Sequence, residues 1–172
     1  MISSYAQKAC TFLLQTRLDF SGVWVDCGCG QGYYMEALLY LGAYPVIGID
    51  ISIDIDHFSL QNIPYYSICG DGRALPLRDA TARGILYVNV LHYFSNSQPL
   101  LEEAVRVLHR SGRVVIIEYA QSVPTGWNPH PLSVSQIKVL LSRNKLSCIR
   151  TLQVDTSYRP KNIVIGEKKE YL

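Results

Sequence analysis

A run of glycines and acidic residues carries the strongest chemical signal in this sequence. It reads Asp26-Cys27-Gly28-Cys29-Gly30-Gln31-Gly32 and follows a short β-rich apolar stretch. Glycine adopts backbone angles that other residues resist, and it lets a ligand approach the main chain closely. Free N–H groups at the start of a following helix favour a negative group. The pattern predicts a nucleotide-like ligand, although a glycine loop alone is a weak signal.

Two further aspartates sharpen this prediction. Asp50 ends the next apolar run, 18 residues after Gly32, and Asp71 lies between two glycines after the run at 65–69. The carboxyl ends of parallel strands form the edge at which open α/β sheets bind ligands. At that edge Asp50 could accept hydrogen bonds from both ribose hydroxyls, and Asp71 could accept one from an adenine amino group. Because aspartate also favours turns at strand ends, the prediction rests on all three carboxylates together.

Alternating strand and helix patterns would place these residues on one sheet edge. Short β-rich runs alternate with helix-period stretches, which predicts a parallel sheet covered by helices. Strands are expected at 22–26, 45–50, 65–69, 84–90 and 113–118, with a closing antiparallel pair at 148–155 and 162–168. Helices are expected at 3–16, through 35–39 to a stop at Gly42, through 100–108 to a stop at Gly112, and from a Ser133/Gln136 capping box to about Arg143.

Length and composition indicate one soluble globular domain over residues 1–172, with a helical segment at 1–20. The chain is 48% hydrophobic and 17% charged, and 172 residues are too few for two comfortable domains. No apolar run could cross a bilayer, and the first residues lack a signal-peptide pattern. Five cysteines at spacings unlike a disulfide framework favour the reducing cytoplasm. No second pair completes a zinc set with Cys27 and Cys29, so no metal site is expected.

From Val23 to Glu118, the chain resembles the class I S-adenosylmethionine-dependent methyltransferases of the small-molecule type. The resemblance rests on five motifs in the family's order, at residues 25–32, 46–52, 70–77, 88–92 and 103–108. It implies an α/β fold, a three-layer α/β/α sandwich with a mostly parallel seven-stranded sheet and an antiparallel C-terminal strand. It also implies that the chain is an enzyme using S-adenosyl-L-methionine as its cofactor.

The resemblance assigns a role to each part of the cofactor site. The backbone of the glycine turn would cradle the methionine and ribose portions, with Asp26 and the Asn89 carbonyl near the methionine amine. Asp50 would hold the ribose, while Asp71 and Gly72 would bracket the adenine. The complete set of expected cofactor-binding residues is Asp26, Cys27, Gly28, Gly30, Gly32, Asp50, Ile51, Asp71, Gly72, Asn89 and Val90.

The catalytic residues are harder to predict, because methyl transfer needs a base only when the acceptor must lose a proton. His92 follows the fourth strand and is the preferred candidate, because its pKa suits proton transfer near neutrality; it could equally cap or pack at the helix start. Tyr93 is a second candidate, and Glu118 and Tyr119 are weaker ones. Tyr33 and Tyr34 could face the sulfonium or belong to the core. The loop at 123–131 could wall an acceptor pocket or be a rigid connection, and His57 and His109 are expected at the surface.

A small molecule is the expected acceptor, largely by elimination. The sequence 89–92 is not the Asn/Asp-Pro-Pro-aromatic motif associated with amide-nitrogen methylation, and no Pro-Cys pair or basic-aromatic tract points to nucleic acid. Two departures from the family pattern are Arg83-Gly84, where an aspartate usually precedes the fourth strand, and the lack of a large insertion that could form an acceptor lid.

Two other functions remain open from the sequence. The small size is compatible with a cofactor-binding scaffold or activator of a partner methyltransferase, which would add a protein partner. A nicotinamide-dependent oxidoreductase is opposed by Tyr33, which replaces the third glycine of a dinucleotide fingerprint, and by the closing hairpin.

Overall fold

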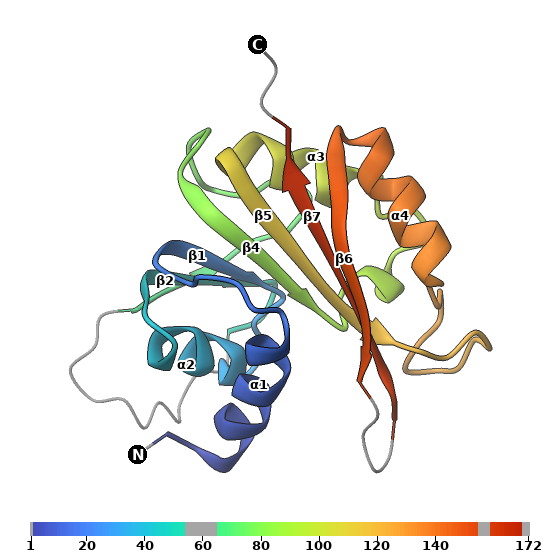
Figure 1. The fold of residues 1–172 in the computed structure, drawn as a ribbon, viewed down its shortest axis with the longest axis horizontal. Coiled ribbons are helices and arrows are strands. Elements are labelled where there is room, and N and C mark those ends of the chain that lie inside the picture. Colours follow the sequence, from blue (N-terminus) through green and yellow to red (C-terminus); the bar gives the residue numbers. More distant parts are fainter. Residues whose placement is uncertain (1, 54–64, 155–158, 170–172) are drawn as a thin grey trace.

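The computed structural model describes residues 2–53, 65–154 and 159–169, and in these residues it contains one seven-stranded sheet. The strand order is β3-β2-β1-β4-β5-β7-β6 (Figure 1). The strands are β1 Gly22–Cys27, β2 Ala43–Asp50, β3 Tyr65–Cys69, β4 Ala82–Val88, β5 Leu108–Tyr119, β6 Leu146–Val154 and β7 Lys161–Lys168. Only β7 runs antiparallel to its neighbours β5 and β6. The expected mostly parallel sheet with an antiparallel C-terminal strand is therefore confirmed.

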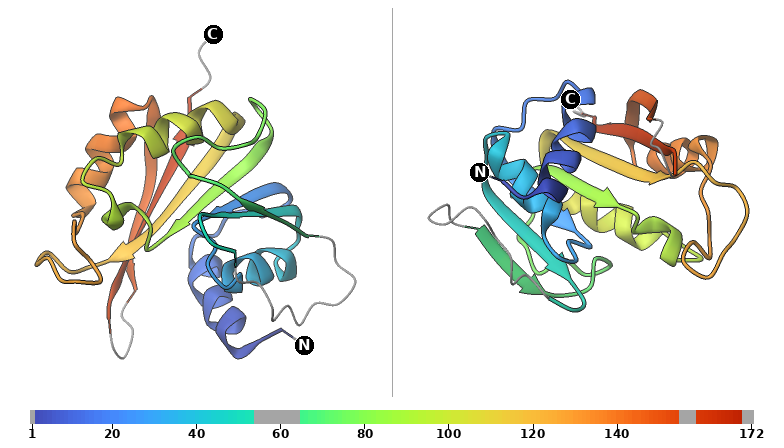
Figure 2. Two further views of the ribbon diagram at one scale, coloured as in Figure 1. Left: turned by 180° about the vertical axis from the view of Figure 1, so that it is seen from behind. Right: turned by 90° about the horizontal axis from the view of Figure 1, so that it is seen from below.

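Helices cover both faces of the sheet. The described helices are α1 Ser4–Gln15, α2 Tyr33–Tyr40, the short 3-10 helix η1 Leu91–Tyr93, α3 Gln98–Val107 and α4 Val134–Arg143. One hydrophobic cluster joins α1 and α2 to one face of the sheet, and a second joins α3 and α4 to the other (Figures 1 and 2). The central strands supply both clusters because successive side chains of a strand point to opposite faces. The three-layer sandwich is confirmed.

Local chemistry explains where the outer helices begin. The Ser3 hydroxyl accepts a hydrogen bond from the Ala6 amide at the start of α1 and donates one of 2.6 Å to Glu36 in α2. At α4, the side chains of Ser133 and Gln136 form the expected reciprocal capping box. These contacts fix α1 against α2 and set the direction in which α4 leaves the preceding loop.

The boundary between α3 and β5 differs from the expectation. The helix ends at Val107, and Leu108 is already a buried strand residue paired with Ala82. The chain then bulges outward, with Ser111 at φ +59°, before Arg113 resumes the pairing. The prediction that Gly112 ends the helix is therefore wrong, because pairing with β4 captures Leu108 despite its helical spacing.

The departure at Arg83-Gly84 has a packing explanation. Gly84 pairs with Trp24 of β1, and a Cβ at Gly84 would lie 2.4 Å from the Trp24 ring. Glycine thus leaves room for the fully buried indole near the amino end of β4, at the end of the sheet opposite the glycine turn. The substitution affects core packing and leaves the candidate site intact.

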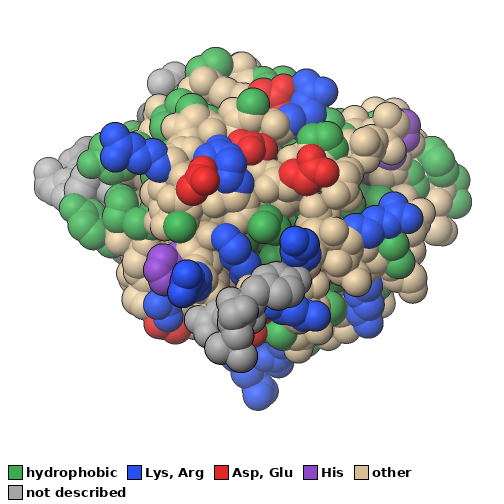
Figure 3. Space-filling model, turned by 90° about the horizontal axis from the view of Figure 1, so that it is seen from above, with side chains coloured by type: hydrophobic (Ala, Val, Ile, Leu, Met, Phe, Trp, Pro, Cys, Tyr) green, Lys and Arg blue, Asp and Glu red, His purple; other side chains and the backbone are tan. Residues whose placement is uncertain are grey.

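Charged side chains are distributed unevenly over the surface. Lys and Arg side chains gather on the face at the top of Figure 1, with fewer Asp and Glu among them (Figure 3). β5 begins and β7 ends on this side, so it lies opposite the carboxyl ends of the parallel strands. The basic face is therefore separate from the edge that holds the glycine turn.

Candidate functional site

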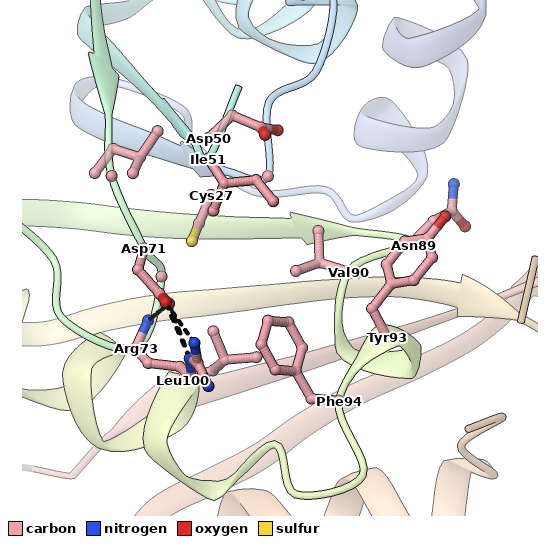
Figure 4. Close-up of a pocket in the computed structure, with 14 residues that line it drawn as sticks. Cys27, Asp50, Ile51, Asp71, Arg73, Asn89, Val90, Tyr93, Phe94 and Leu100 are labelled. Atoms are coloured by element: carbon pink, nitrogen blue, oxygen red, sulfur yellow. Dashed lines mark hydrogen bonds and ion pairs between the residues drawn. The ribbon is translucent and has the colours of Figure 1, made fainter. Parts of the chain in front are cut away.

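A cavity of about 390 Å³ lies at the carboxyl ends of β1, β2, β3 and β4 (Figure 4). Its volume falls within the range of about 300–1,000 Å³ that is usual for small-molecule sites. Its lining residues are Cys27, Gly28, Ile49, Asp50, Ile51, Gly70, Asp71, Gly72, Arg73, Asn89, Val90, Tyr93, Phe94 and Leu100. The cavity therefore occupies the sheet edge that the sequence predicts for a ligand.

The glycine turn forms one wall of this cavity through an unusually close backbone approach. Gly28 has φ +82°, and a Cβ there would lie 2.3 Å from Cγ2 of Val90. The Gly28 amide donates a 2.7 Å hydrogen bond to the Ile49 carbonyl, and the Cys29 amide donates one of 3.2 Å to the same oxygen. Only glycine fits between β2 and the chain that follows β4, so the shape of the turn depends on the absence of a side chain at position 28.

Asp50 connects the end of β2 to the glycine turn. Its Oδ2 accepts a 2.8 Å hydrogen bond from the Gly30 amide, and its Oδ1 accepts one of 3.1 Å from the Ser52 amide. The carboxylate also lines the cavity. A carboxylate oxygen can accept more than one hydrogen bond, so Asp50 retains the capacity to bind ligand hydroxyls while its position is fixed.

Asp71 forms an ion pair with Arg73, which the sequence does not predict. Its carboxylate accepts hydrogen bonds from the Arg73 amide at 2.8 Å and from Arg73 Nη2 at 2.6 Å (Figure 4). These bonds lower the pKa of Asp71. The Arg73 guanidinium also lies 5.5 Å from the Phe94 ring centroid. A ligand group at this end of the cavity therefore meets a paired aspartate.

Asp26 lies behind the cavity wall, where it is 1% exposed. Burial raises the pKa of its carboxyl to about 7, with a further increase from the charge of Asp50, and a backbone hydrogen bond from Met35 opposes the shift. Among the described residues, Asp26 Oδ2 has no hydrogen-bond partner. An unpartnered buried carboxylate oxygen next to a glycine turn suits a ligand ammonium group.

The structure brings together most of the expected cofactor-binding residues. Those that line the cavity are Cys27, Gly28, Asp50, Ile51, Asp71, Gly72, Asn89 and Val90. Asp26, Gly30 and Gly32 do not line it, since Gly30 binds Asp50 and Gly32 precedes the first turn of α2 in the left-handed conformation. The sequence reasoning missed Phe94 and Leu100, although the apolar spacing after Pro99 was a signal for Leu100.

Of the two expected catalytic residues, Tyr93 lines the cavity and His92 does not. His92 is 1% exposed, and its Nδ1 lies 2.6 Å from Oε2 of the equally buried Glu118. Oε1 of Glu118 accepts a 2.8 Å hydrogen bond from the Leu91 amide. This arrangement fixes η1 against the end of β5. His92 Nε2 has no partner among the described residues.

The weaker candidates lie on the side of the site next to β5 and β7. Tyr119 packs edge-on against Trp127 of the loop at 123–131, with ring centroids 4.7 Å apart. Burial raises the pKa of Tyr34, and the charges of Asp26 and Tyr119 add to this shift. Tyr33 instead stacks on Tyr5 of α1 at 4.6 Å.

The remaining sequence expectations concern metals, thiols and surface histidines. No group of three His, Cys, Asp or Glu side chains suited to a metal occurs in the described part of the chain. All five cysteines are free thiols, and burial raises the pKa of Cys27 to about 12. His109 is exposed at the surface, whereas His57 lies outside the described residues. No described helix has the length and apolar character needed to span a membrane.

The fold and the site together define a Rossmann-like, class I S-adenosylmethionine-dependent methyltransferase. The antiparallel C-terminal strand, the glycine turn and the acidic strand ends are features of this class that the sequence predicts. The sequence profile of the family described as "Methyltransferase domain" matches residues 25–116, which is more than half of the chain. The chain belongs to this family, which agrees with the predicted enzyme class and with S-adenosyl-L-methionine as its cofactor.

Sequence relatives carry methyltransferase names. The demethylmenaquinone methyltransferase of Tropheryma whipplei is 35% identical over 102 residues, which is 56% of this chain and 41% of that protein. The tRNA U34 carboxymethyltransferase of Campylobacter curvus is 29% identical over 112 residues, which is 60% of this chain and 37% of that protein. The matched segment is less than half the length of these relatives.

Solved structures share the fold over nearly the whole chain. The 1,6-didemethyltoxoflavin-N1-methyltransferase of Burkholderia thailandensis, solved with 1,6-didemethyltoxoflavin and S-adenosylhomocysteine, has a TM-score of 0.80 and 15% identity. The similarity covers 97% of this chain and 79% of that one. The magnesium protoporphyrin IX methyltransferase of Synechocystis has a TM-score of 0.72 and 18% identity, over 95% and 78% of the two chains. At these identities the similarity concerns the fold.

Proposed function

We propose that this chain transfers the methyl group of S-adenosylmethionine to a small-molecule acceptor. The observation that carries the proposal is the cavity at the sheet edge, where the Gly28 turn, Asp50 and Asp71 meet from three successive strands. The relative named for demethylmenaquinone and the structural neighbour with bound 1,6-didemethyltoxoflavin support a small acceptor. One relative is named for tRNA, so label that enters RNA in place of small molecules would identify a nucleic-acid acceptor.

The residues at the cavity suit the three parts of the cofactor. Asp50 would accept hydrogen bonds from the ribose hydroxyls, because it lines the cavity and both of its oxygens are fixed by backbone amides. The apolar side chains of Phe94 and Leu100 would enclose the adenine, with Asp71 at its polar edge. The unpartnered oxygen of Asp26 would pair with the methionine ammonium once the turn adjusts around it.

The main catalytic task would be alignment. Methyl transfer is an in-line displacement, and holding the acceptor, methyl carbon and sulfur in line removes much of the barrier. The chain after β4 lines the cavity with Asn89 and Tyr93, and the acceptor would lie on this side. Buried His92 would act as a positioning residue, since its contact with Glu118 fixes this chain to β5.

A cytoplasmic location is part of the same proposal. Buried Cys10, Cys27 and Cys29 and exposed Cys69 and Cys148 are all free thiols. Free thiols at the surface suit a reducing compartment. No observation favours a role confined to activating a partner, or one in nicotinamide chemistry.

A labelling assay tests the proposed activity. The purified chain is incubated with S-adenosylmethionine carrying a labelled methyl group and an extract of small metabolites, and the products are separated by mass. Label should enter the small-molecule fraction with the unaltered chain and with Asp19→Ala, which changes an exposed aspartate outside the cavity, but not with Asp50→Ala. Binding of S-adenosylhomocysteine without any labelling would contradict the transfer activity, and absence of binding would contradict the cofactor assignment as well.

A further inference from the structure

An unusual lysine lies next to Asn89 at the border of the cavity, where three strands meet. Lys161 is the first residue of β7 and pairs with Tyr119, the last residue of β5. Its Nζ donates a hydrogen bond to Oδ1 of Asn89, which follows β4 and lines the cavity. Because β7 is antiparallel to the other strands, its beginning lies at the same edge as their carboxyl ends. The sequence reasoning did not single out this residue.

Aromatic and cationic groups surround the lysine. Lys161 Nζ lies 3.1 Å from the centroid of the Tyr119 ring. The Arg159 guanidinium lies 3.8 Å from the Trp127 ring centroid and 5.8 Å from that of Tyr119. These four side chains form a wall of flat rings and positive charge, which we call the β5–β7 wall. Such a wall favours a planar ligand that carries or develops negative charge.

The environment of Lys161 also suits proton transfer. Burial lowers the pKa of its amine to about 7; the negative charge of Glu118 opposes this shift, and the positive charge of Arg159 adds to it. Glu118, Arg159 and Tyr119 are the titratable groups that face the amine, from β5 and from the segment before β7. A base is most effective when its pKa lies near the working pH.

We propose that Lys161 is the general base of this enzyme and that the β5–β7 wall binds a planar acceptor with an acidic hydroxyl group, a phenol or an enol. This inference rests on the proposed methyl transfer. In the step, the acceptor O–H bond breaks and its proton moves to the Lys161 amine, which becomes an ammonium. The oxygen electron pair forms a bond to the methyl carbon while the carbon–sulfur bond breaks, and that electron pair remains on sulfur to give neutral S-adenosylhomocysteine.

The acidity of the acceptor hydroxyl decides how readily it gives its proton to the Lys161 amine. An ordinary phenol such as that of tyrosine has a pKa of about 10, whereas water has one of about 15.7. A phenol or an enol gives its proton to an amine more readily than an aliphatic alcohol does, and the flat rings of the β5–β7 wall favour such a planar acceptor. The resulting anion would lie between two cations, Lys161 and Arg159, which stabilise it as the proton leaves.

A coloured probe tests this inference directly. 4-Nitrophenol is an electron-poor phenol whose anion absorbs at longer wavelength than the neutral form. It is titrated into protein saturated with S-adenosylhomocysteine, at a pH where the free probe is mostly neutral. The unaltered protein should bind the probe as its anion. Lys161→Met should bind it about tenfold more weakly, as expected from the loss of a charged hydrogen bond, and without the anion band. Lys138→Met, on the exposed side of α4, should behave as the unaltered protein.

The outcomes separate this inference from the proposed function. If the unaltered protein binds S-adenosylhomocysteine but the bound probe stays neutral, or if Lys161→Met keeps the anion band, the β5–β7 wall proposal is overturned and the cofactor site stands. If S-adenosylhomocysteine does not bind to the unaltered protein, the proposed function fails and this inference fails with it. Retained binding of S-adenosylhomocysteine by Lys161→Met shows that the variant is folded.

A second measurement needs no variant. The unaltered protein is treated briefly with acetic anhydride over a range of pH, and acetylation of each lysine is measured by mass spectrometry. Acetylation of Lys161 should reach half of its limiting rate near pH 7. An acetylation rate of Lys161 that keeps rising well above pH 7 would overturn its assignment as the base.

Discussion

Replacement of Gly28 by alanine tests the closest backbone contact in the site. A Cβ at this position would lie 2.3 Å from Cγ2 of Val90, and the backbone has φ +82°. The left-handed conformation costs a non-glycine residue about 1–2 kcal/mol. Forcing a methyl group into a packed region costs about 1–3 kcal/mol more. Gly28→Ala should therefore lower the free energy of unfolding by about 2–5 kcal/mol.

The clash also predicts a loss of cofactor affinity. Relief of the contact must move the glycine turn or Val90, and both line the cavity. If the overpacking cost of about 1–3 kcal/mol falls on the bound state, S-adenosylhomocysteine should bind about 5- to 140-fold more weakly. Urea unfolding gives the stability change, and isothermal titration calorimetry gives the affinity.

Gly42→Ala is the matched control. Gly42 follows α2 and has φ +96°, and a Cβ there would meet no other described atom within 4 Å. This variant should lose about 1–2 kcal/mol of stability from backbone strain alone and keep its affinity for S-adenosylhomocysteine. Adding Val90→Ala to Gly28→Ala should restore part of the lost stability, because the two side chains compete for one space. Equal behaviour of Gly28→Ala and Gly42→Ala would refute the reasoning.

Three further predictions concern the buried and cavity-lining charges. Asp50→Ala should weaken binding of S-adenosylhomocysteine by about 10- to 140-fold in calorimetry, through loss of charged hydrogen bonds; an unchanged affinity would exclude Asp50 from the cofactor site. The pKa of Asp26 is raised to about 7 in the folded chain. Below about pH 4 the carboxyl is protonated in both the folded and the unfolded chain, and its contribution to stability is fully present. That contribution is lost as the pH rises through 7, because the folded chain must then bury a charge. Asp26→Asn should therefore be more stable than the unaltered, cofactor-free protein at pH 8, by up to about 4 kcal/mol in urea unfolding, and equal to it below pH 4; the opposite pH trend would contradict the buried placement. His92→Ala should lose about 3–5 kcal/mol, because it leaves Glu118 buried and unpaired, and a loss well below this in the same urea assay would show that the pair is not buried in solution.

The sequence predicts well which residues line the cavity, because this part of the molecule is built from local patterns. A glycine turn and aspartates at strand ends need only the order of strands to bring them together, and Gly28, Asp50 and Asp71 do line one cavity. The paired state of Asp71 with Arg73 was not predicted. It depends on a two-residue turn whose side-chain geometry has no periodic signal.

The contacts on the proposed acceptor side could not be predicted from the sequence, because they join distant parts of the chain. Lys161 and Asn89 are 72 residues apart and meet only because β7 inserts between β5 and β6. The preference for His92 followed from its intrinsic pKa, but burial against Glu118 is a tertiary property. Similarly, the helical spacing that includes Leu108 was outweighed by strand pairing with Ala82.

The central claim is that the glycine turn and the carboxylates at its edge bind an S-adenosyl cofactor. Isothermal titration of the purified chain with S-adenosylhomocysteine, and separately with NAD, tests it most directly. We expect saturable binding of one S-adenosylhomocysteine per chain and no measurable heat with NAD. A preference for NAD, or no binding of S-adenosylhomocysteine, would contradict the claim.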